Sequence, residues 1–425
     1  MEERRADTPT TSAAPSGSGL VPLRRGLVWS LGLGAFGLAF AITTTTYLQV
    51  LLARFTDSGT LIGLVLGAEG LFALALSPVI GPWSDTFHTP LGRRRPFMIV
   101  ALGPMAFCLA LVAFMPSFWT MTLVLMAFFF AYYVFEPPYR GLYPDLLDPQ
   151  TYGRAQGVQH IMRGIALGLG LIGGGLLLDV WHPLPFLVAA LVTAAACGAC
   201  IWLVREDGGY GAVYEGTRAY LHRSWQVLHD FTDVRAFLAA NAAWEAAFAA
   251  ARVSVVNYIV RFLHQPPRVS ALVLAAVAGG YVVAAVGAGR IGDRLGLAPV
   301  IFVCSFVYAG GFLVGGLATE WHYWYLALVF VVAIAGGSVM TLAWGLLFKV
   351  MPIEHRGAAA GLATTTKGIG LIVGPVLAGA VIDLTSYRAL WPVCALFVIA
   401  SIPIVFRLIR AEAAISGPGT RARPA

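Results

Sequence analysis

Charged side chains are scarce in this sequence. Of its 425 residues only 12% are charged, whereas 58% are apolar; a soluble globular protein carries about twice that share of charge. Apolar stretches of about 20 residues, almost free of charge, recur along the whole length, and each is long enough to cross a bilayer as a helix. The composition argues against a soluble protein and predicts an integral membrane protein.

Cysteine is also rare. The five cysteines all lie in apolar surroundings, which gives no sign of a disulfide framework. Cys197 and Cys200 have the spacing of metal ligands, but no second pair accompanies them, so small packing residues are the better interpretation. We expect no metal and no cofactor.

Lysine is nearly absent, since 26 of the 28 basic residues are arginine. The net charge of +7 is spread over many short connections, which is typical of membrane topology and does not indicate a nucleic-acid surface. Residues 1–22 and 411–425 are polar tails that we predict to be disordered and cytoplasmic. Residues 1–22 also lack the short apolar segment and cleavage site of a signal peptide.

Twelve apolar segments predict membrane-spanning helices. They lie near residues 26–50, 60–83, 97–116, 118–137, 157–179, 184–204, 236–260, 270–289, 298–318, 323–346, 357–382 and 387–406. The termini and the even-numbered connections hold 21 of the 28 basic residues, and the odd-numbered connections hold four. Basic connections remain in the cytoplasm, so we predict a multi-pass protein of the cell membrane with both termini cytoplasmic.

The two halves of the chain repeat. The segment "GRAQGVQHIMRGIALGLGLIGGGLLLD" (153–179) aligns with "RGAAAGLATTTKGIGLIVGPVLAGAVID" (356–383) when Asp179 is placed on Asp383. Four glycine pairs then coincide: Gly157 with Gly361, Gly164 with Gly368, Gly170 with Gly374, and Gly175 with Gly379. Arg163 coincides with Lys367. Glycines at such positions permit close contact between helices that slide past one another.

The repeat predicts the domain organisation. A six-helix half over residues 23–204 is joined to a second over residues 236–410 by a cytoplasmic connection, 205–235, that contains a surface helix. The predicted fold class is an all-α membrane protein with twelve transmembrane helices in two pseudo-symmetric six-helix halves. In such proteins a central site opens to alternate sides when one half rocks against the other.

Motifs of nucleotide chemistry give no support for an enzyme. "GLGAFG" (32–37) and "GLGLIG" (168–173) match a dinucleotide pattern, but each lies inside an apolar helix and follows no strand. Helix packing therefore explains both better. There is no Walker A loop, HExxH or GxSxG sequence. We expect no enzyme activity, and passive or ion-coupled transport is the simpler hypothesis.

The connection after the second span carries the most specific motif. It reads "GPWSDTFHTPLGRRRPF" (81–97), and the second half contains "GRIGDRLG" (289–296). The shared features are Gly81, Asp85, Gly92, Arg93 and Arg94 in the first copy and Gly289, Asp293 and Arg294 in the second. Their spacing resembles the loop signature of the major facilitator superfamily. The resemblance implies a conformational latch, in which the aspartate pairs with arginine across the cytoplasmic face. Anchoring by positive charge alone explains the arginines but not the repeated Gly–Asp pair.

Two stretches narrow the resemblance. "SPVIGPWSD" with "LGRRRPF", and "PPYRGLYPDL" (137–146), are similar to the sucrose–proton symporter branch of the glycoside–pentoside–hexuronide family. This implies proton-coupled uptake of a disaccharide or glycoside, with Arg140 as the substrate-linked arginine. Two positions depart from the pattern. Ser77 stands where sodium-coupled melibiose carriers have an aspartate, and Phe129 stands where plant sucrose carriers have one, so coupling needs another acid.

Glutamates inside the predicted spans are the candidates for that acid. Glu69, Glu136 and Glu245 are expensive to bury in a bilayer, so we assign them to proton coupling. Glu136 lies one helical turn before Arg140 and can reach it. The alternative for this pair is a solvated helix end at the cytoplasmic surface.

One face of the seventh span is polar and aromatic. Asn241, Glu245, Phe248 and Arg252 fall in a narrow stripe at helical spacing, which suits a sugar cavity. The alternative is that Glu245 and Arg252 are structural partners of charges on neighbouring helices.

Two further groups of polar residues are weaker candidates. Tyr47 and Gln49 are further cavity candidates, although hydroxyls in this region also bond their own helix backbone. We expect Arg163 and Lys367 to extend toward the cytoplasm.

The sequence therefore predicts a secondary transporter that takes up a sugar together with protons by alternating access. One alternative is a proton-coupled exporter of drugs or metabolites, and another is a non-transporting assembly or sensor protein with the same fold. We expect a monomer in the lipid bilayer whose partners are protons and a small molecule, with no nucleic acid.

Overall fold

The computed structural model describes residues 25–87, 89–147, 152–206, 217–350 and 356–416, and in these ranges the regular structure is helical. The helices of the first half are α1 (Arg25–Thr44), α2 (Leu48–Leu52), α3 (Gly59–Thr86), α4 (Arg95–Leu111), α5 (Phe118–Leu146), α6 (Tyr152–Val180) and α7 (Leu184–Leu203). The remaining helices are α8 (Thr217–Asp230), α9 (Thr232–Asn257), α10 (Pro267–Leu295), α11 (Leu297–Gly315), α12 (Tyr325–Val350), α13 (Arg356–Leu384) and α14 (Leu390–Ser416).

Eleven helical segments in the described ranges are long and apolar enough to cross a membrane. The twelfth long helix, α9, is less apolar because Asn241, Glu245 and Arg252 interrupt its alanine-rich sequence. It nevertheless packs against α13 and α14 and buries most of its side chains. The predicted fold class, with twelve spans, is confirmed, and the polar character of α9 marks it as a functional helix.

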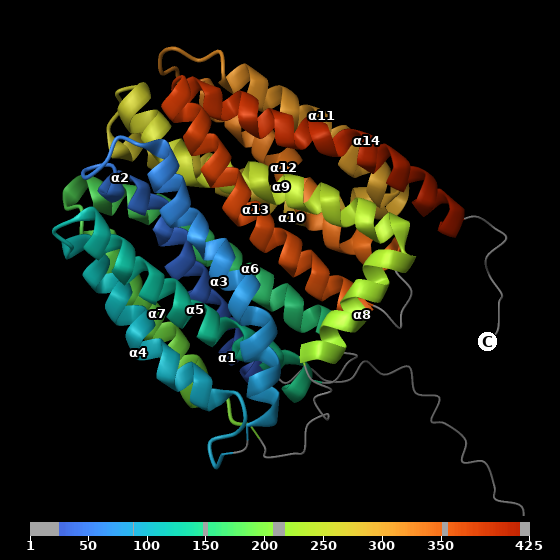
Figure 1. The fold of residues 1–425 in the computed structure, drawn as a ribbon. Coiled ribbons are helices and arrows are strands. Elements are labelled where there is room, and N and C mark those ends of the chain that lie inside the picture. The colour runs from blue at the N-terminus through green and yellow to red at the C-terminus, as the bar shows by residue number, and fades with distance from the viewer. Residues whose placement is uncertain (1–24, 88, 148–151, 207–216, 351–355, 417–425) are drawn as a thin grey trace, which may run out of the picture.

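The chain forms two groups of helices (Figure 1). Helices α1 to α7, blue to green, lie in one group, and α9 to α14, yellow to red, lie in the other. Extensive contact between the groups occurs where α3 packs on α13 and where α6 packs on α10. The connecting helix α8 contacts α3, α9 and α13.

Glycines allow the two halves to touch backbone to backbone. A Cβ atom on Gly63 would collide with the carbonyl of Pro375, and one on Gly379 would collide with the carbonyl of Gly59. In the other contact, a Cβ on Gly175 would meet the side chain of Ala271. Gly175 and Gly379 are a predicted repeat pair, and both lie between the halves, as expected for close helix contacts.

The contacts that join the halves cluster on the face away from the termini. Asp383 accepts hydrogen bonds from the Ser58 hydroxyl (2.7 Å) and the Thr60 amide (2.9 Å). Nearby, Arg261 pairs with Asp57 at 2.9 Å. This face is closed, so with cytoplasmic termini the molecule faces inward.

Helix ends differ from the predicted boundaries. Helix α14 continues to Ser416, beyond the predicted end at residue 410. The Glu412 carboxylate accepts hydrogen bonds from the amides of Leu297 (2.9 Å) and Ala298 (2.7 Å), and it pairs with Lys349 at 2.7 Å. These bonds fix the last turns of a segment that composition alone assigned to a disordered tail. Residues 1–22 lie outside the described ranges.

Candidate substrate and proton site

A buried ion pair joins the two halves in the middle of the membrane. The Arg252 guanidinium of α9 donates a hydrogen bond to the Glu69 carboxylate of α3. The side chains are only 18% and 7% exposed, respectively. Glu69 lies ten residues into α3, or about 15 Å from its first turn. Removing one partner of such a pair leaves an uncompensated charge, which is strongly destabilising.

A second ion pair lies nearer the terminus face. Arg140 Nε donates to the Glu136 carboxylate at 2.5 Å, between residues one turn apart on α5. The Glu136 side chain is 14% exposed, whereas the Arg140 side chain is 50% exposed. Arg140 is therefore accessible from the open side of the structure while Glu136 is shielded beneath it.

Two cations join these pairs, although their sequence positions suggested a surface role. Lys367 of α13 interacts electrostatically with both Glu136 and Glu245. Arg163 of α6 interacts electrostatically with Glu136. The expectation that both extend to the cytoplasm is corrected, because the interior carboxylates attract them. The repeat alignment that sets Arg163 on Lys367 was the sequence signal for this placement.

These seven side chains form what we call the central charge cluster. Its members are Glu69, Glu136, Arg140, Arg163, Glu245, Arg252 and Lys367. Tyrosines surround it: Tyr132 and Tyr133 of α5 interact electrostatically with Glu69 and Glu136, and Tyr281 and Tyr308 interact with Glu245. Sequence reasoning missed these four tyrosines, because nothing in a single helix indicates which face meets charges on another.

The remaining candidates of α9 have different surroundings. Asn241 is buried, and its amide donates to the Ala363 carbonyl (3.2 Å) and the Thr366 hydroxyl (3.0 Å). It therefore holds α9 to α13 within the second half. Phe248 is half-buried on the same stripe, three residues after Glu245.

Tyr47 and Gln49 are buried in contacts between helices. The Tyr47 hydroxyl donates to the Leu171 carbonyl within the first half. Gln49 accepts from the Asn257 amide at 2.9 Å and donates to the Arg252 carbonyl at 3.3 Å. Gln49 thus links α2 to α9 across the halves, on the closed side of the Glu69–Arg252 pair.

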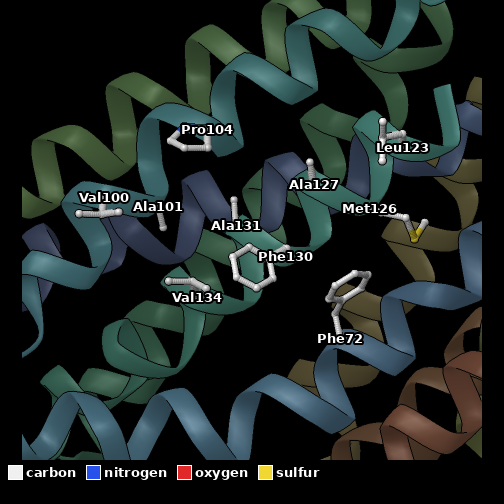
Figure 2. Close-up of a pocket in the computed structure, with 10 residues that line it drawn as sticks. All are labelled: Phe72, Val100, Ala101, Pro104, Leu123, Met126, Ala127, Phe130, Ala131 and Val134. Carbon is white, nitrogen blue, oxygen red and sulfur yellow. The ribbon is translucent and has the colours of Figure 1, made fainter. Parts of the chain in front are cut away.

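A separate pocket lies between α3, α4 and α5 (Figure 2). Its volume is about 500 Å³. It is lined by Phe72, Val100, Ala101, Pro104, Leu123, Met126, Ala127, Phe130, Ala131 and Val134. Every lining residue is apolar, and Val100 and Leu123 are each 71% exposed on the outer surface. Phe72 is three residues after Glu69, so the pocket reaches close to the central charge cluster without presenting a polar group.

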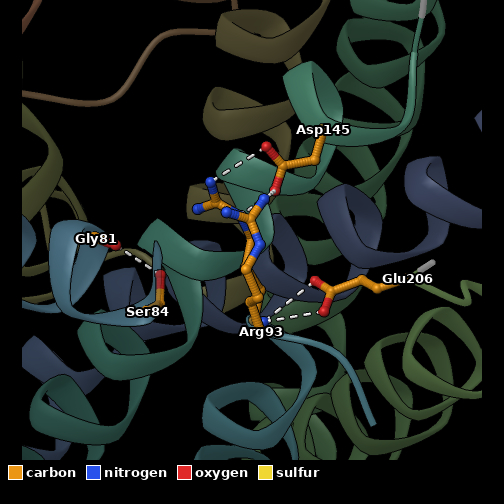
Figure 3. A network of polar contacts seen from close by, with 6 residues as sticks. Gly81, Ser84, Arg93, Asp145 and Glu206 are labelled. Atoms are coloured by element: carbon orange, nitrogen blue, oxygen red, sulfur yellow. Dashed lines mark hydrogen bonds and ion pairs between the residues drawn. The ribbon is translucent and has the colours of Figure 1, made fainter. Parts of the chain in front are cut away.

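The arginines of the predicted latch bind a carboxylate that sequence reasoning had not selected (Figure 3). Asp145, at the end of α5, pairs with Arg93 Nη2 at 2.9 Å and with Arg94 Nε at 2.6 Å. The Arg94 amide donates to Glu206 at 3.0 Å. Asp145 belongs to the stretch "PPYRGLYPDL", which contained the signal. Burial raises the pKa of Glu206, and the amides of Arg94 and Arg93 partly oppose this shift.

Other latch residues are less constrained. Gly92 has φ of +103°, and a Cβ there would collide with Glu206, so only glycine fits this turn. The Gly81 carbonyl accepts from the Ser84 hydroxyl at 2.6 Å. Gly289 has open space around it, and Arg294 is exposed. The side chains of Asp85 and Asp293 lie outside what the structure describes.

The two halves share one capping arrangement on the terminus face. Glu206, after α7, binds the amide at the start of α4, and Glu412, late in α14, binds the amides at the start of α11. A carboxylate at a helix N-terminus satisfies free amides and favours the helix dipole. The internal repeat therefore extends beyond the sequence motif to the third and last helices of each half.

Comparison with known proteins identifies the family. The model of the Major Facilitator Superfamily matches residues 29–263 and 236–424. An uncharacterised MFS-type transporter of Mycobacterium tuberculosis is 30% identical over 114 residues, which is 27% of this chain and 16% of that protein's length. A fission yeast (Schizosaccharomyces pombe) transporter, also uncharacterised, is 29% identical over 94 residues, 22% of this chain and 16% of its own length.

Solved structures agree in fold. The nucleoside transporter NupG superposes with a TM-score of 0.74 at 16% identity, covering 91% of this chain and 99% of NupG. A bacterial homologue of the human lysosomal transporter Spinster, in an inward-facing and unoccupied conformation, gives 0.72 at 14% identity, covering 96% of this chain and 100% of that protein. The two superfamily matches together span nearly all the described helices. The chain belongs to the Major Facilitator Superfamily, is a secondary transporter of a small molecule, and is not an enzyme.

Proposed function

We propose that the protein takes up a sugar, a disaccharide or glycoside, together with protons across the cell membrane, with both termini in the cytoplasm. The observation that carries this proposal is the buried Glu69–Arg252 ion pair between the halves. A carrier that alternates its access must break contacts between its halves on one side and form them on the other. An ion pair at that junction is sensitive to the protonation of its carboxylate.

The pair supplies a coupling mechanism. Protonation of Glu69 removes the attraction to Arg252 and weakens the junction on the closed side, which favours opening there. Glu245 is a second acceptor, because it has no hydrogen-bond or ion-pair partner within the described residues. Glu136 is held by Arg140 and is released when substrate engages that arginine.

The surroundings of the pair supply binding groups for a polar cargo. Tyr133, Glu245 and Arg140 offer groups that bind hydroxyls, and Phe248 offers a ring that stacks on an apolar sugar face. Arg252 Nε is buried with no hydrogen-bond partner in the described part of the chain, so it is free to donate to a sugar hydroxyl.

An uptake assay tests the proposal. The purified protein is reconstituted in proteoliposomes and given labelled monosaccharides and disaccharides with and without an imposed pH gradient. We expect saturable uptake that the gradient drives and that Glu69→Gln abolishes, while Asp179→Asn, which changes an exposed carboxylate, leaves it unchanged. Saturable uptake that ignores the gradient would refute proton coupling, and no uptake of any sugar would refute the substrate.

The apolar pocket favours a second candidate, the export of amphipathic compounds. Its lining opens on the outer surface of the span and ends at Phe72, close to Glu69. An amphipathic molecule entering from the bilayer would place its apolar part there and its polar part at the carboxylate. Extrusion of a lipophilic cation from the same proteoliposomes, lost in Ala131→Trp, would support this candidate over sugar uptake.

A further inference from the structure

The central charge cluster is not electrically balanced. Among the described residues it contains four cations, Arg140, Arg163, Arg252 and Lys367, and three carboxylates, Glu69, Glu136 and Glu245. Two ion pairs use two members of each sign. One unit of positive charge is left inside the membrane span. An uncompensated charge there is costly unless something else neutralises it.

The excess charge lies at Arg163 and Lys367. Within the described residues neither side chain makes a hydrogen bond or an ion pair within 4 Å, and both are half-buried. Each is eleven residues from the start of its helix, α6 or α13, so both lie about 16 Å in from the terminus face. Both interact with Glu136, which places them on one side of the cluster.

We propose that the substrate is a monoanion, a hydroxylated organic acid whose single carboxylate binds between Arg163 and Lys367. This inference rests on the proposed sugar transport through the central site and names the chemical class of the sugar, an acidic one. A carboxylate brings the one negative charge that the cluster lacks. It also forms the charge-assisted hydrogen bonds for which both cations have free donors.

The position of the two cations gives the carboxylate a mechanical role. Arg163 belongs to the first half and Lys367 to the second, on the side of the cluster nearer the terminus face. A carboxylate bound to both would draw the halves together on the side that is now open. Substrate would thereby promote closure there, while the Glu69–Arg252 junction and the contacts at Asp383 release on the opposite side.

The probes are matched acid and neutral sugars. Binding of lactobionate is compared with binding of lactose, and gluconate with glucose, by competition on the purified full chain in detergent. We expect each acid to bind at least ten-fold tighter than its neutral partner, and Arg163→Gln or Lys367→Gln to remove that preference. Lys367→Arg keeps the charge and should keep the preference, as should Arg290→Gln, which changes an exposed arginine of α10. Size-exclusion profiles check that each variant is folded.

The outcomes separate this inference from the proposed function. Neutral sugars that bind and are taken up as well as the acids overturn the monoanion but leave sugar transport intact. A preference for acids that persists in both glutamine variants overturns the site, as does tighter binding of a sugar phosphate than of the carboxylate. No uptake of either class in proteoliposomes overturns the proposed function itself.

Discussion

The Asp383 carboxylate at the end of α13 binds the beginning of α3 in the opposite half. It accepts hydrogen bonds from the Ser58 hydroxyl (2.7 Å), from the amides of Gly59 and Thr60, and from the Thr60 hydroxyl (2.6 Å). Its repeat partner, Asp179, is exposed and makes no hydrogen bond within the described residues. The sequence explains the difference, because α10 begins with Pro267, which has no N–H to donate, whereas α3 begins with Gly59 and Thr60.

Replacement of Asp383 by asparagine should open the closed face. The substitution removes the charge from four hydrogen bonds, and we expect a cost of at least about 1 kcal/mol to the closed state, or a five-fold change in its population. Spin labels at Val180 and Glu320, at helix ends on this face, would report longer distances in Asp383→Asn. Asp179→Asn is the matched control and should leave the distance distribution unchanged. A change of equal size in both variants would mean that the asymmetry has no functional weight.

The fold was accessible from sequence because each span carries its own signal. Apolar length predicts a helix wherever it lies, and the basic residues predict its orientation. Even α9 was found, since its few polar residues interrupt a long apolar run. The repeat also predicted the glycine contacts, such as Gly379 against Gly59, because helix packing is set by residue size.

The site was less accessible because its contacts join distant parts of the chain. Glu69 and Arg252 were each selected as buried charges, but nothing local shows that they bind each other across 183 residues. Lys367 was assigned to the surface because its nearest carboxylates belong to α5 and α9. Asp145 was overlooked for the same reason, since its arginines precede it by a full span.

Breaking the Glu69–Arg252 pair should cost more than removing it. Arg252→Gln leaves the Glu69 carboxylate buried without its partner, and we expect about 3 kcal/mol lower stability. The double variant Glu69→Gln with Arg252→Gln should recover part of that loss, because no charge is left uncompensated. Thermal unfolding in detergent gives the comparison. Asp57→Asn, whose carboxylate is 98% exposed in its pair with Arg261, should change stability by less than about 1 kcal/mol. Additive effects of the two cluster substitutions would show that the pair is not coupled.

Glu206 should make stability depend on pH. Its pKa is raised by burial, so the folded protein holds this proton at a higher pH than the unfolded chain does. Its contribution to stability is therefore present at low pH and is lost as the pH rises through the raised pKa. Between about pH 7 and pH 4, acidification should stabilise the wild type relative to Glu206→Gln, by less than about 1 kcal/mol because water screens this half-buried group. Melting curves of both proteins across this range give the difference, and parallel curves would contradict it.

Gly63→Ala should weaken the contact between α3 and α13. Alanine favours an isolated helix over glycine by about 0.5–1 kcal/mol, but here its Cβ would meet the Pro375 carbonyl. Backbone atoms cannot move aside as a flexible side chain can, so the two helices must separate. We expect a lower melting temperature and a shift toward opening of the closed face, measured with the labels at Val180 and Glu320. Gly103→Ala in α4 has open space around it and should be neutral or slightly stabilising. If Gly63→Ala is stabilised to the same extent, the two helices do not depend on this close approach to close the face.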